Sequence, residues 1–449
     1  MASLRTACCL FTPAAIAVNI VTNCADGGVG SLREAVLEAP ENGVVDATGL
    51  TNVCSVITVK TGDIQVAVND LTILGPGADA LSVTALYVTS HSFHHYYSRI
   101  FNHTGSGTLI LKNLSVTDGL LKNGGSQPLL GGCIFSKGNV SLMQSIVSNC
   151  TISSTATADA GGGGIDAQGK VYLLNSLVTH NLVTGVTFDV FGGGIASAGF
   201  ESHYAVISGN TVNGGSDNYS VVLGGGLRAS GTIDIESTTI SGNAVTGGRP
   251  IQPSGQQSAK GGGVSAYGMV TVRNSTISGN SSGGGAGGIV VSTNGKDLTL
   301  LNSTIAFNRS GQDNAAGAQI AATNFDFESN ILANNTWGSA GTNNDLQAST
   351  FGALTGSHNL VFATSASVPA GTLIGKCPLL GPLRNNGGAT PTHALFSHSP
   401  AIDAGSNPAD LGNDQRGPPY LRTLGSGTDI GSYEVNPAEV IFNSGFDGC

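Results

Sequence analysis

The sequence is poor in charge, since only 10% of its 449 residues are Asp, Glu, Lys or Arg. Lys and Arg nowhere form a run, so a nucleic-acid partner is not expected. Apolar residues still make up 40% of the chain. That balance argues against disorder, which needs low hydrophobicity and high charge. The formal net charge of −10 indicates a soluble acidic surface more than any particular partner.

Several sequence signatures are also missing. No stretch of about 18 apolar residues occurs after the first residues, so no transmembrane helix is expected. The glycine-rich stretches contain no GxxxxGK[ST] sequence, which disfavours a phosphate-binding loop. No Cys-x-x-Cys pair is present, so the cysteines are expected to form disulfides rather than metal sites. The 67 glycines follow no three-residue period, which excludes a collagen-like chain.

The chain contains instead a repeat that ends in Asn. The stretch "VTVRNSTISGN" at 270–280 returns in weaker form at 171–181, 233–243 and 298–308. Positions eight and ten before the Asn are apolar in most copies, and alternation with period two predicts strands with one buried face. The final Asn can donate and accept amide hydrogen bonds to the next copy. The predicted ladder comprises Asn181, Asn210, Asn243, Asn280, Asn308 and Asn334, with Cys150 in the equivalent earlier place.

Glycine clusters such as Gly161–Gly164 and Gly224–Gly226 separate the copies. Glycine adopts backbone angles forbidden to other residues, so these clusters predict tight corners. Strands and corners without helical segments predict an all-β fold, a right-handed parallel β-helix. The expected solenoid is single-stranded and resembles the superfold of pectate lyases. The stretch "GSLREAVLEA" at 30–39 predicts a short helix, capped at Ser31, that closes the first coil.

The N-terminus and the cysteines suggest an exported protein. Residues 1–17 have one Arg, a short apolar run and a small-residue end, which is typical of a secretory signal cleaved after Ala17. Cleavage would remove Cys8 and Cys9. Six cysteines then remain, and an even number in an exported chain suggests disulfides of undetermined connectivity. We hypothesise the pairs Cys24–Cys54, Cys133–Cys150 and Cys377–Cys449.

Three stretches together resemble a family of secreted bacterial β-helix proteins with a choice-of-anchor Q domain. "GSLREAVLEA" is similar to the family's CSLREA-like motif, with Gly30 where Cys is frequent, and "LTILGPGADALSV" at 71–83 is similar to its first coils. "PLLGPLRNNGGATPTHALFSHSPAIDAG" at 378–405, with "NDQRG" and "DIGSYE" downstream, is similar to the choice-of-anchor Q domain. A looser similarity links the repeats to polymorphic outer-membrane adhesins. The resemblance implies the fold and a secreted or outer-surface location on a bacterium, and no single activity.

These features divide the chain into five parts. They are a signal peptide at 1–17, an N-terminal cap and first coil at 18–60, a parallel β-helix at 61–376, a Q-like segment at 377–434 and a tail at 435–449.

The C-terminal motif places one cation among four carboxylates. We expect a bidentate pair between Arg416 and a carboxylate to fasten this segment against the last coil. A catalytic role would need paired carboxylates that face a cleft. The residues concerned are Asp403, Asp414, Arg416, Asp429 and Glu434.

Two other places are candidates for binding or chemistry. The repeat alignment stacks Arg273 beside Glu236, with Asp234 on the same strand face, as part of a groove or as a surface ion pair. The stretch "TSHSFHHYYSRIF" at 89–101, with one further His, suggests a divalent metal, sugar stacking, or simple packing. Its candidates are His91, His94, His95, His103, Tyr96 and Tyr97.

The alignment leaves the last copy irregular, because Asn324 and Asp326 fall at apolar places. Asp326 and Glu328 lie two residues apart in this irregular copy and are candidate Ca²⁺ ligands. No other cofactor is expected.

The leading functional hypothesis is a secreted or cell-surface protein that binds or adheres to a polysaccharide or another cell-surface polymer without catalysis. The alternative is a polysaccharide lyase or glycoside hydrolase, although the Asp-Asp and Arg-x-Lys signatures of familiar pectin-active families are missing. A third hypothesis is a stalk or coat protein without a specific ligand. The sequence indicates no oligomeric state.

Overall fold

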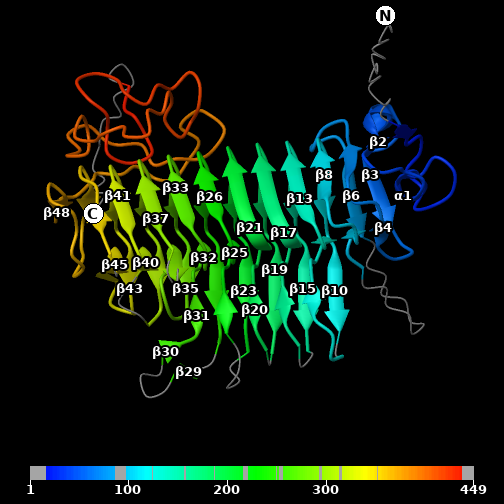
Figure 1. The fold of residues 1–449 in the computed structure, drawn as a ribbon, viewed down its shortest axis with the longest axis horizontal. Helices are drawn as coiled ribbons and strands as arrows, with labels where there is room; N and C mark the ends of the chain where they lie inside the picture. Colours follow the sequence, from blue (N-terminus) through cyan, green and yellow to red (C-terminus); the bar gives the residue numbers. More distant parts are fainter. Residues whose placement is uncertain are drawn as a thin grey trace, which may run out of the picture.

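The computed structural model describes residues 17–85, 98–123, 125–155, 158–186, 188–215, 221–248, 250–251, 256–292, 296–312, 316–350 and 352–436. Within these residues the chain winds into coils that stack along one axis (Figure 1). Neighbouring coils pair in parallel, as Val270 and Val272 do with Ile233 and Ile235. The predicted all-β parallel β-helix is confirmed. In this part of the chain no helix is both long and apolar enough to cross a membrane.

Sheet A receives two short strands from most coils, and alternate residues of each strand point into the core. Val270 and Val272 are fully buried, as the period-two pattern predicts. The strands of this sheet are β1 Val18–Ile20, β2 Gly43–Asp46, β4 Ile64–Val66, β5 Leu71–Leu74, β7 Phe101–His103, β8 Thr108–Lys112, β12 Ile134–Ser136, β13 Asn139–Met143, β17 Ile165–Leu174, β21 Ile195–His203, β25 Leu227–Ala229, β26 Ile233–Glu236, β32 Val264–Ala266, β33 Val270–Arg273, β36 Ile289–Ser292, β37 Leu298–Leu301, β40 Ala318–Ala322, β41 Phe325–Glu328, β45 Leu346–Thr350 and β46 Leu354–Thr355.

Sheet B follows sheet A in each coil and closes the other side of the main core. Val178, Ile207, Ile240, Ile277 and Ile305 stack in register along it and are buried. Its strands are β3 Val56–Val59, β6 Ser82–Ala85, β9 Ser115–Thr117, β14 Ile146–Ser148, β18 Leu177–Thr179, β22 Val206–Ser208, β27 Thr239–Ser241, β34 Thr276–Ser278, β38 Thr304–Ala306, β42 Ile331–Ala333, β47 Leu360–Val361 and β48 Leu373–Ile374.

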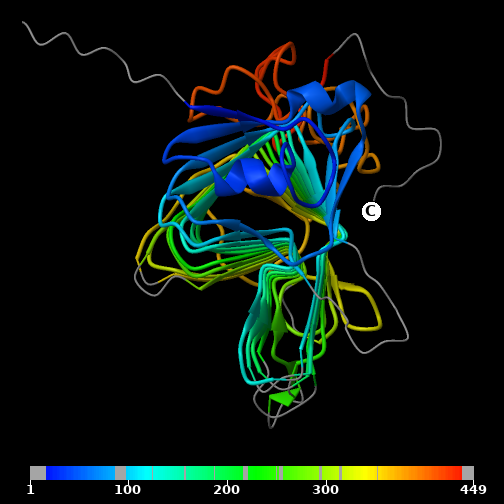
Figure 2. The same ribbon diagram turned by 90° about the vertical axis from the view of Figure 1, so that its right-hand side faces the viewer.

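The middle coils also carry an arm, made of two facing sheets, that projects from the main coil (Figure 2). The arm has a small core of its own, which includes Ile152, Val183, Val212 and Val245. Sheet C contains β10 Leu120–Asn123, β15 Thr151–Ser154, β19 Leu182–Gly185, β23 Thr211–Asn213, β28 Ala244–Thr246, β35 Ser281–Ser282, β39 Arg309–Ser310, β43 Thr336–Trp337 and β44 Thr342–Asn343. Sheet D contains β11 Leu129–Leu130, β16 Ala160–Gly161, β20 Val190–Phe191, β24 Val222–Leu223 and β31 Ala259–Lys260, and a small hairpin joins β29 Pro250–Ile251 to β30 Gln256–Gln257.

The corner between sheets B and C holds a ladder of buried amides. Each ladder Asn donates from Nδ2 to Oδ1 of the next, at 2.9 Å from Asn181 to Asn210 and 2.9 Å from Asn243 to Asn280. Each Nδ2 also reaches a backbone carbonyl of the preceding coil, as that of Asn280 does at Ile240. These bonds satisfy polar groups that burial would otherwise leave unpaired.

The predicted end of the ladder is wrong by one residue. Asn308 donates to Asn335, and Asn335 donates at 2.7 Å to the carboxylate of Asp345. Asn334 instead has φ +60° and belongs to the turn. The adjacent Asn residues allowed either alignment, and only the stacking of the coils decides between them.

The same shift removes the expected irregularity of the last copy. Counted from Asn335, the apolar places hold Phe325 and Phe327, which pair with Leu298 and Leu300 and are fully buried. Asn324 and Asp326 therefore do not occupy core places, and the copy is regular.

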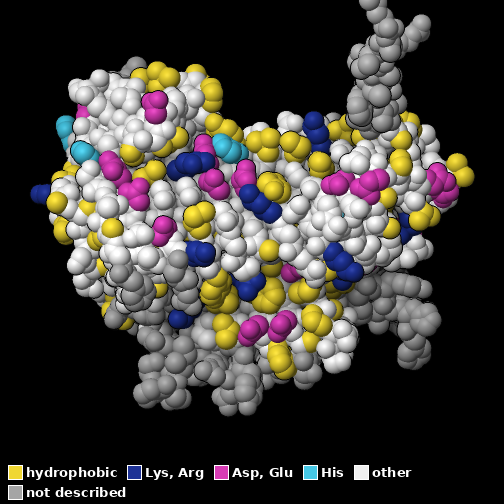
Figure 3. Space-filling model, viewed as in Figure 1, with side chains coloured by type: hydrophobic (Ala, Val, Ile, Leu, Met, Phe, Trp, Pro, Cys, Tyr) yellow, Lys and Arg dark blue, Asp and Glu magenta, His cyan; other side chains and the backbone are white. Residues whose placement is uncertain are grey.

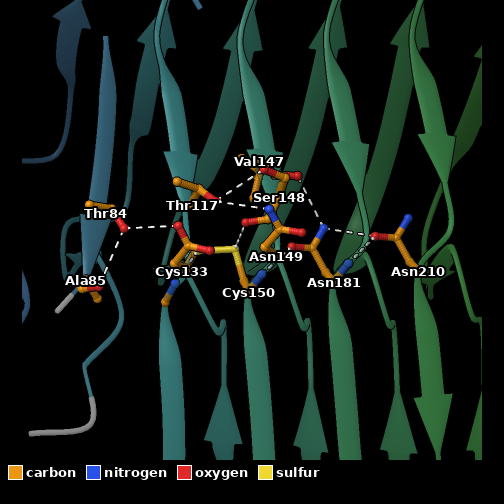
Figure 4. Close-up of a disulfide and its surroundings, with 12 residues drawn as sticks. Thr84, Ala85, Thr117, Cys133, Val147, Ser148, Asn149, Cys150, Asn181 and Asn210 are labelled. Atoms are coloured by element: carbon orange, nitrogen blue, oxygen red, sulfur yellow. Dashed lines mark hydrogen bonds between the residues drawn. A yellow bond between two sulfur atoms is a disulfide. The ribbon is translucent and has the colours of Figure 1, made fainter. Parts of the chain in front are cut away.

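Two of the three hypothesised disulfides are present. Cys133 and Cys150 lie 5.5 Å apart between Cα atoms, and Cys24 and Cys54 lie 6.5 Å apart. Figure 4 shows Cys150 in line with the ladder, where its N–H donates to Oδ1 of Asn181 at 3.0 Å. The third pair stays a prediction, because Cys449 lies outside the described residues.

The predicted short helix is α1, Leu32–Leu37. It begins after Ser31, whose Oγ accepts a hydrogen bond from the N–H of Glu34 at 3.2 Å. Its buried residues belong to the main core, and Figure 2 shows the helix at the N-terminal end of the coil. A 3₁₀ helix, Thr48–Asn52, follows it. Closure of the coil by α1 stays a prediction.

Candidate functional site

Residues 378–436 do not extend the coil but lie along sheet B over several coils, above the strands in Figure 1. Asn274 donates to the carbonyl of Asn413 at 3.1 Å, and Asn302 donates to that of Ser406 at 2.7 Å. Thr276 donates to the side chain of Gln415 at 2.5 Å. The segment therefore packs against the last coil, as expected, and is also fastened to coils in the middle of the β-helix.

Arg416 forms the predicted bidentate pair with Asp414, donating from Nε to Oδ1 at 3.2 Å and from Nη2 to Oδ2 at 2.7 Å. Both side chains are buried and belong to the same segment, so the pair stabilises the segment itself. The guanidinium lies 3.9 Å from the ring centroids of both Tyr420 and Tyr433.

A second buried cation, Arg422, was missed by the sequence analysis. Arg422 lies 3.9 Å from Glu434 and donates to the carbonyl of Asp429. Asp403 and Asp429 accept backbone hydrogen bonds, which hold the loops in place. These carboxylates are structural groups and line no pocket that the structure describes.

The predicted cluster on sheet A exists as a network of ion pairs. Arg273 stands beside Glu236 in the register and pairs with it, and its Nη2 lies 3.2 Å from Asp234. His203, which the sequence analysis overlooked, stacks on Glu236 with its Nε2 3.3 Å from the carboxylate. His203, Glu236 and Arg273 all precede their ladder Asn by seven residues, so the alignment already contained this signal.

The charges in this cluster neutralise one another. The hydrogen bond to Glu236 raises the pKa of His203, and the same bond lowers the pKa of Glu236. Burial raises the pKa of Asp234. Arg273 is engaged by both carboxylates, and such partly exposed pairs contribute under about 1 kcal/mol each. We interpret the cluster as a tie between neighbouring coils.

The candidate metal ligands do not assemble in the described part of the chain. His103 is buried inside the coil, with Nδ1 2.7 Å from Ser136 and Nε2 2.9 Å from the carbonyl of Asn69, so it cannot face a loop. Asp326 accepts from Thr355, and Glu328 accepts from Ser406 of the C-terminal segment. No group of three His, Cys, Asp or Glu suited to a metal occurs among the residues described. The remaining loop candidates, His91, His94, His95, Tyr96 and Tyr97, lie outside the described residues.

The corner line along which sheet D of the arm meets the first strands of sheet A is called the elbow here. Glycines with positive φ make this corner in successive coils, for example Gly162 at +66° and Gly224 at +65°. A Cβ on Gly162 would lie 2.7 Å from Cβ of Asp166, so glycine lets the corner fold closely over the outer face of sheet A. Figure 3 shows hydrophobic side chains together with basic and acidic ones on this face.

One residue from each of eight successive coils points outward into the elbow, and we call this set the elbow row. Its members pair in register, so successive side chains lie one strand spacing, about 4.8 Å, apart. The row spans roughly 34 Å over its length. Its residues are Phe135, Asp166, Ala196, Arg228, Ser265, Val290, Gln319 and Gln347.

Several buried polar groups of the elbow row lack a partner. Nε of Arg228, Oγ of Ser265 and Oε1 of Gln319 make no hydrogen bond within the described structure. The carboxylate of Asp166 likewise has no hydrogen bond or close ion pair to a described residue, although Asp166 is only 7% exposed. Leaving such a group unpaired costs about 1–3 kcal/mol, so these groups are suited to a polar ligand.

Burial raises the pKa of Asp166 to about 7, against the opposing effect of Arg228 and Arg99. Arg99 lies 3.4 Å from Asp63 and over the ring of Phe135.

Aromatic rings flank these polar groups. The guanidinium of Arg228 lies 5.1 Å from the ring centroid of Phe191, on sheet D, and 5.7 Å from that of Tyr267. At the far end, Lys260 of sheet D lines a pocket of about 150 Å³ together with Gln319 and Gln347 of the row. Polar groups beside aromatic faces are the usual composition of a small-ligand site.

No family model and no curated protein matches the sequence. The choice-of-anchor Q resemblance of residues 378–405 therefore stays a prediction. Among solved structures the chain is similar to the pectate lyase Pel9A, with a TM-score of 0.48 and 11% sequence identity over 94% of this chain and 98% of that chain. At that identity the similarity assigns no activity, substrate or site residue to this chain.

Proposed function

We propose that this protein binds a neutral polysaccharide along the elbow and does not cleave its glycosidic bonds. The observation that carries the proposal is the elbow row, in which donors and acceptors without partners recur along one line of the sheet, with Ala196 and Val290 between them. A polymer that presents hydroxyl groups along its length can pair with such a row repeatedly. The rings of Phe191 and Tyr267 offer apolar faces beside it.

The charge pattern favours a neutral polymer over a polyanion. The elbow row itself contains one carboxylate, Asp166, and one cation, Arg228. The whole chain carries a net charge of −10, which repels polyanions at long range.

We further propose that the protein acts outside the cell, at a surface or in the medium. The two disulfides support this location, because disulfides persist in oxidising compartments.

Affinity electrophoresis in gels that contain soluble neutral polysaccharides, or polygalacturonate as the anionic comparison, tests the proposed function. We expect retardation by at least one neutral polymer, little retardation by polygalacturonate, and no new reducing ends in solution. Retardation by polygalacturonate alone would contradict the neutral ligand. New reducing ends or unsaturated sugars would favour the hydrolase or lyase alternative, and no retardation by any polymer would favour a stalk or coat protein.

A further inference from the structure

A second feature lies on the opposite side of the coil, between sheet B and the C-terminal segment. A pocket of about 950 Å³ is lined by Ser278 of β34 and His393 of the segment. Phe307, Leu380 and Leu383 supply apolar walls, and Arg309 supplies a cation. The elbow row contributes nothing to this pocket, so the two sites are separate.

The hydrogen bonds of His393 fix its tautomer. Nδ1 lies 2.6 Å from the carbonyl oxygen of Gly381, which can only accept, so Nδ1 carries the proton. Burial lowers the pKa of His393 to about 4, so the ring is neutral at neutral pH. Nε2 is then an acceptor, and Oγ of Ser278, 2.8 Å away, donates to it.

We propose that Ser278 and His393 form a nucleophile and general-base pair that hydrolyses esters whose apolar acyl group occupies this pocket. The arrangement matches what such a pair requires: a hydroxyl donating to a neutral imidazole, an acceptor that orients the other ring nitrogen, and an adjoining cavity. This activity goes beyond the proposed polysaccharide binding and does not rest on it.

The reaction balances without a cofactor. The Oγ–H proton of Ser278 passes to Nε2 of His393 while Oγ bonds to the ester carbonyl carbon. The tetrahedral intermediate then expels the alcohol, which takes the proton from Nε2, and leaves an acyl-serine. Water attacks this acyl group and gives its proton to Nε2, and the departing Oγ recovers that proton as the carboxylic acid leaves. The Arg309 cation lines the same pocket, where it can oppose the negative charge on the carbonyl oxygen.

The chain contains two internal comparisons. Ser241 occupies the neighbouring coil in the same register as Ser278 and lines the same pocket, but its side chain has no imidazole partner in the described structure. Ser136 is hydrogen-bonded to His103, yet that pair is buried inside the coil away from the described pockets. The proposal therefore predicts reactivity at Ser278 and none at Ser241 or Ser136.

The test treats the full-length protein with a fluorophosphonate probe and locates the modified residue by mass spectrometry, with hydrolysis of p-nitrophenyl butyrate measured in parallel. We expect modification at Ser278 and loss of at least about a hundredfold in hydrolysis for Ser278→Ala and for His393→Gln. Ser208→Ala is the matched control and should hydrolyse the ester like the wild type, because Ser208 holds the same register position two coils from Ser278 and does not line this pocket. Since Ala306 follows Ser278 in the register, an alanine fits this place, and an unchanged melting temperature of Ser278→Ala would verify the fold.

The pH dependence supplies a second readout. Hydrolysis should be nearly constant from mildly acidic to neutral pH, because His393 is already deprotonated there. An unmodified Ser278 in the wild type, or equal hydrolysis by Ser278→Ala, overturns the proposal and indicates that the Ser278–His393 bond only fastens the segment to sheet B.

Discussion

Asp166 and Arg228 stand two coils apart in the elbow row, with only Ala196 between them. Their charged ends are too far apart for an ion pair, and the alanine side chain ends at Cβ. Neither charge therefore neutralises the other directly, and a ligand that contacts both side chains could accept from Arg228 and donate to Asp166. This relationship distinguishes the elbow from the Asp234–Arg273 cluster, whose charges are already paired.

The buried carboxylate of Asp166 should reduce stability as pH rises. Its pKa in the folded protein is about 7, above the ordinary value of 3.8, so the folded state holds the proton more tightly than the unfolded state. Stability should therefore fall between about pH 4 and pH 7 and change little above that range. Asp166→Asn removes this dependence. The unfolding free energy of the variant minus that of the wild type should therefore be about 2–4 kcal/mol larger at pH 8 than at pH 4. Urea unfolding of both proteins at the two pH values measures the difference, and an equal effect at both would contradict the assignment.

The corrected end of the amide ladder gives a paired test. Asn335→Ala removes an acceptor for Asn308 and a donor to Asp345 inside the core, so it should cost about 2–4 kcal/mol of unfolding free energy. Asn334→Gly should cost less than about 1 kcal/mol, because its positive φ suits glycine. Chemical unfolding measures both. A larger loss of unfolding free energy for Asn334→Gly than for Asn335→Ala would indicate that Asn334 is the ladder residue.

The C-terminal segment should depend on its buried arginine. Arg416→Met leaves Asp414 buried without its partner and should lower the stability of the segment by about 3–5 kcal/mol. Limited proteolysis should then cut within 378–436 much faster than in the wild type. Arg384→Met is the control, since Arg384 is exposed in the same segment and should leave the cutting rate unchanged. Equal cutting of wild type and Arg416→Met would show that the pair is dispensable.

The repeating strands and glycine corners were predictable because their periods are local. Alternation at Val270 and Val272 predicts a buried face, and the Gly224 cluster predicts a corner, without knowledge of neighbouring coils. The arm was not predicted, because strands such as Val190–Phe191 are too short to show a period. The end of the ladder was predicted one residue too early because Asn334 and Asn335 are adjacent and chemically identical.

The candidate site was harder to predict for a physical reason. Whether Asp166 or Arg228 has a partner depends on residues about 30 positions away that stacking brings alongside, and on the sheet that covers them. The ion pair of Glu236 and Arg273 could be predicted, because its two residues share one position in the repeat. Ser278 and His393 lie 115 residues apart and meet only because the C-terminal segment folds back over sheet B.

The most direct test of the account is the affinity of elbow variants for the neutral polysaccharide that retards the wild type most strongly, measured by isothermal titration. Asp166→Ala and Arg228→Met should each weaken binding at least about tenfold, which is about 1.4 kcal/mol. Asp234→Asn, in the paired cluster on the same sheet, should change the affinity less than about twofold. Unchanged affinity in both elbow variants, or an equal loss in Asp234→Asn, would contradict the elbow as the binding site.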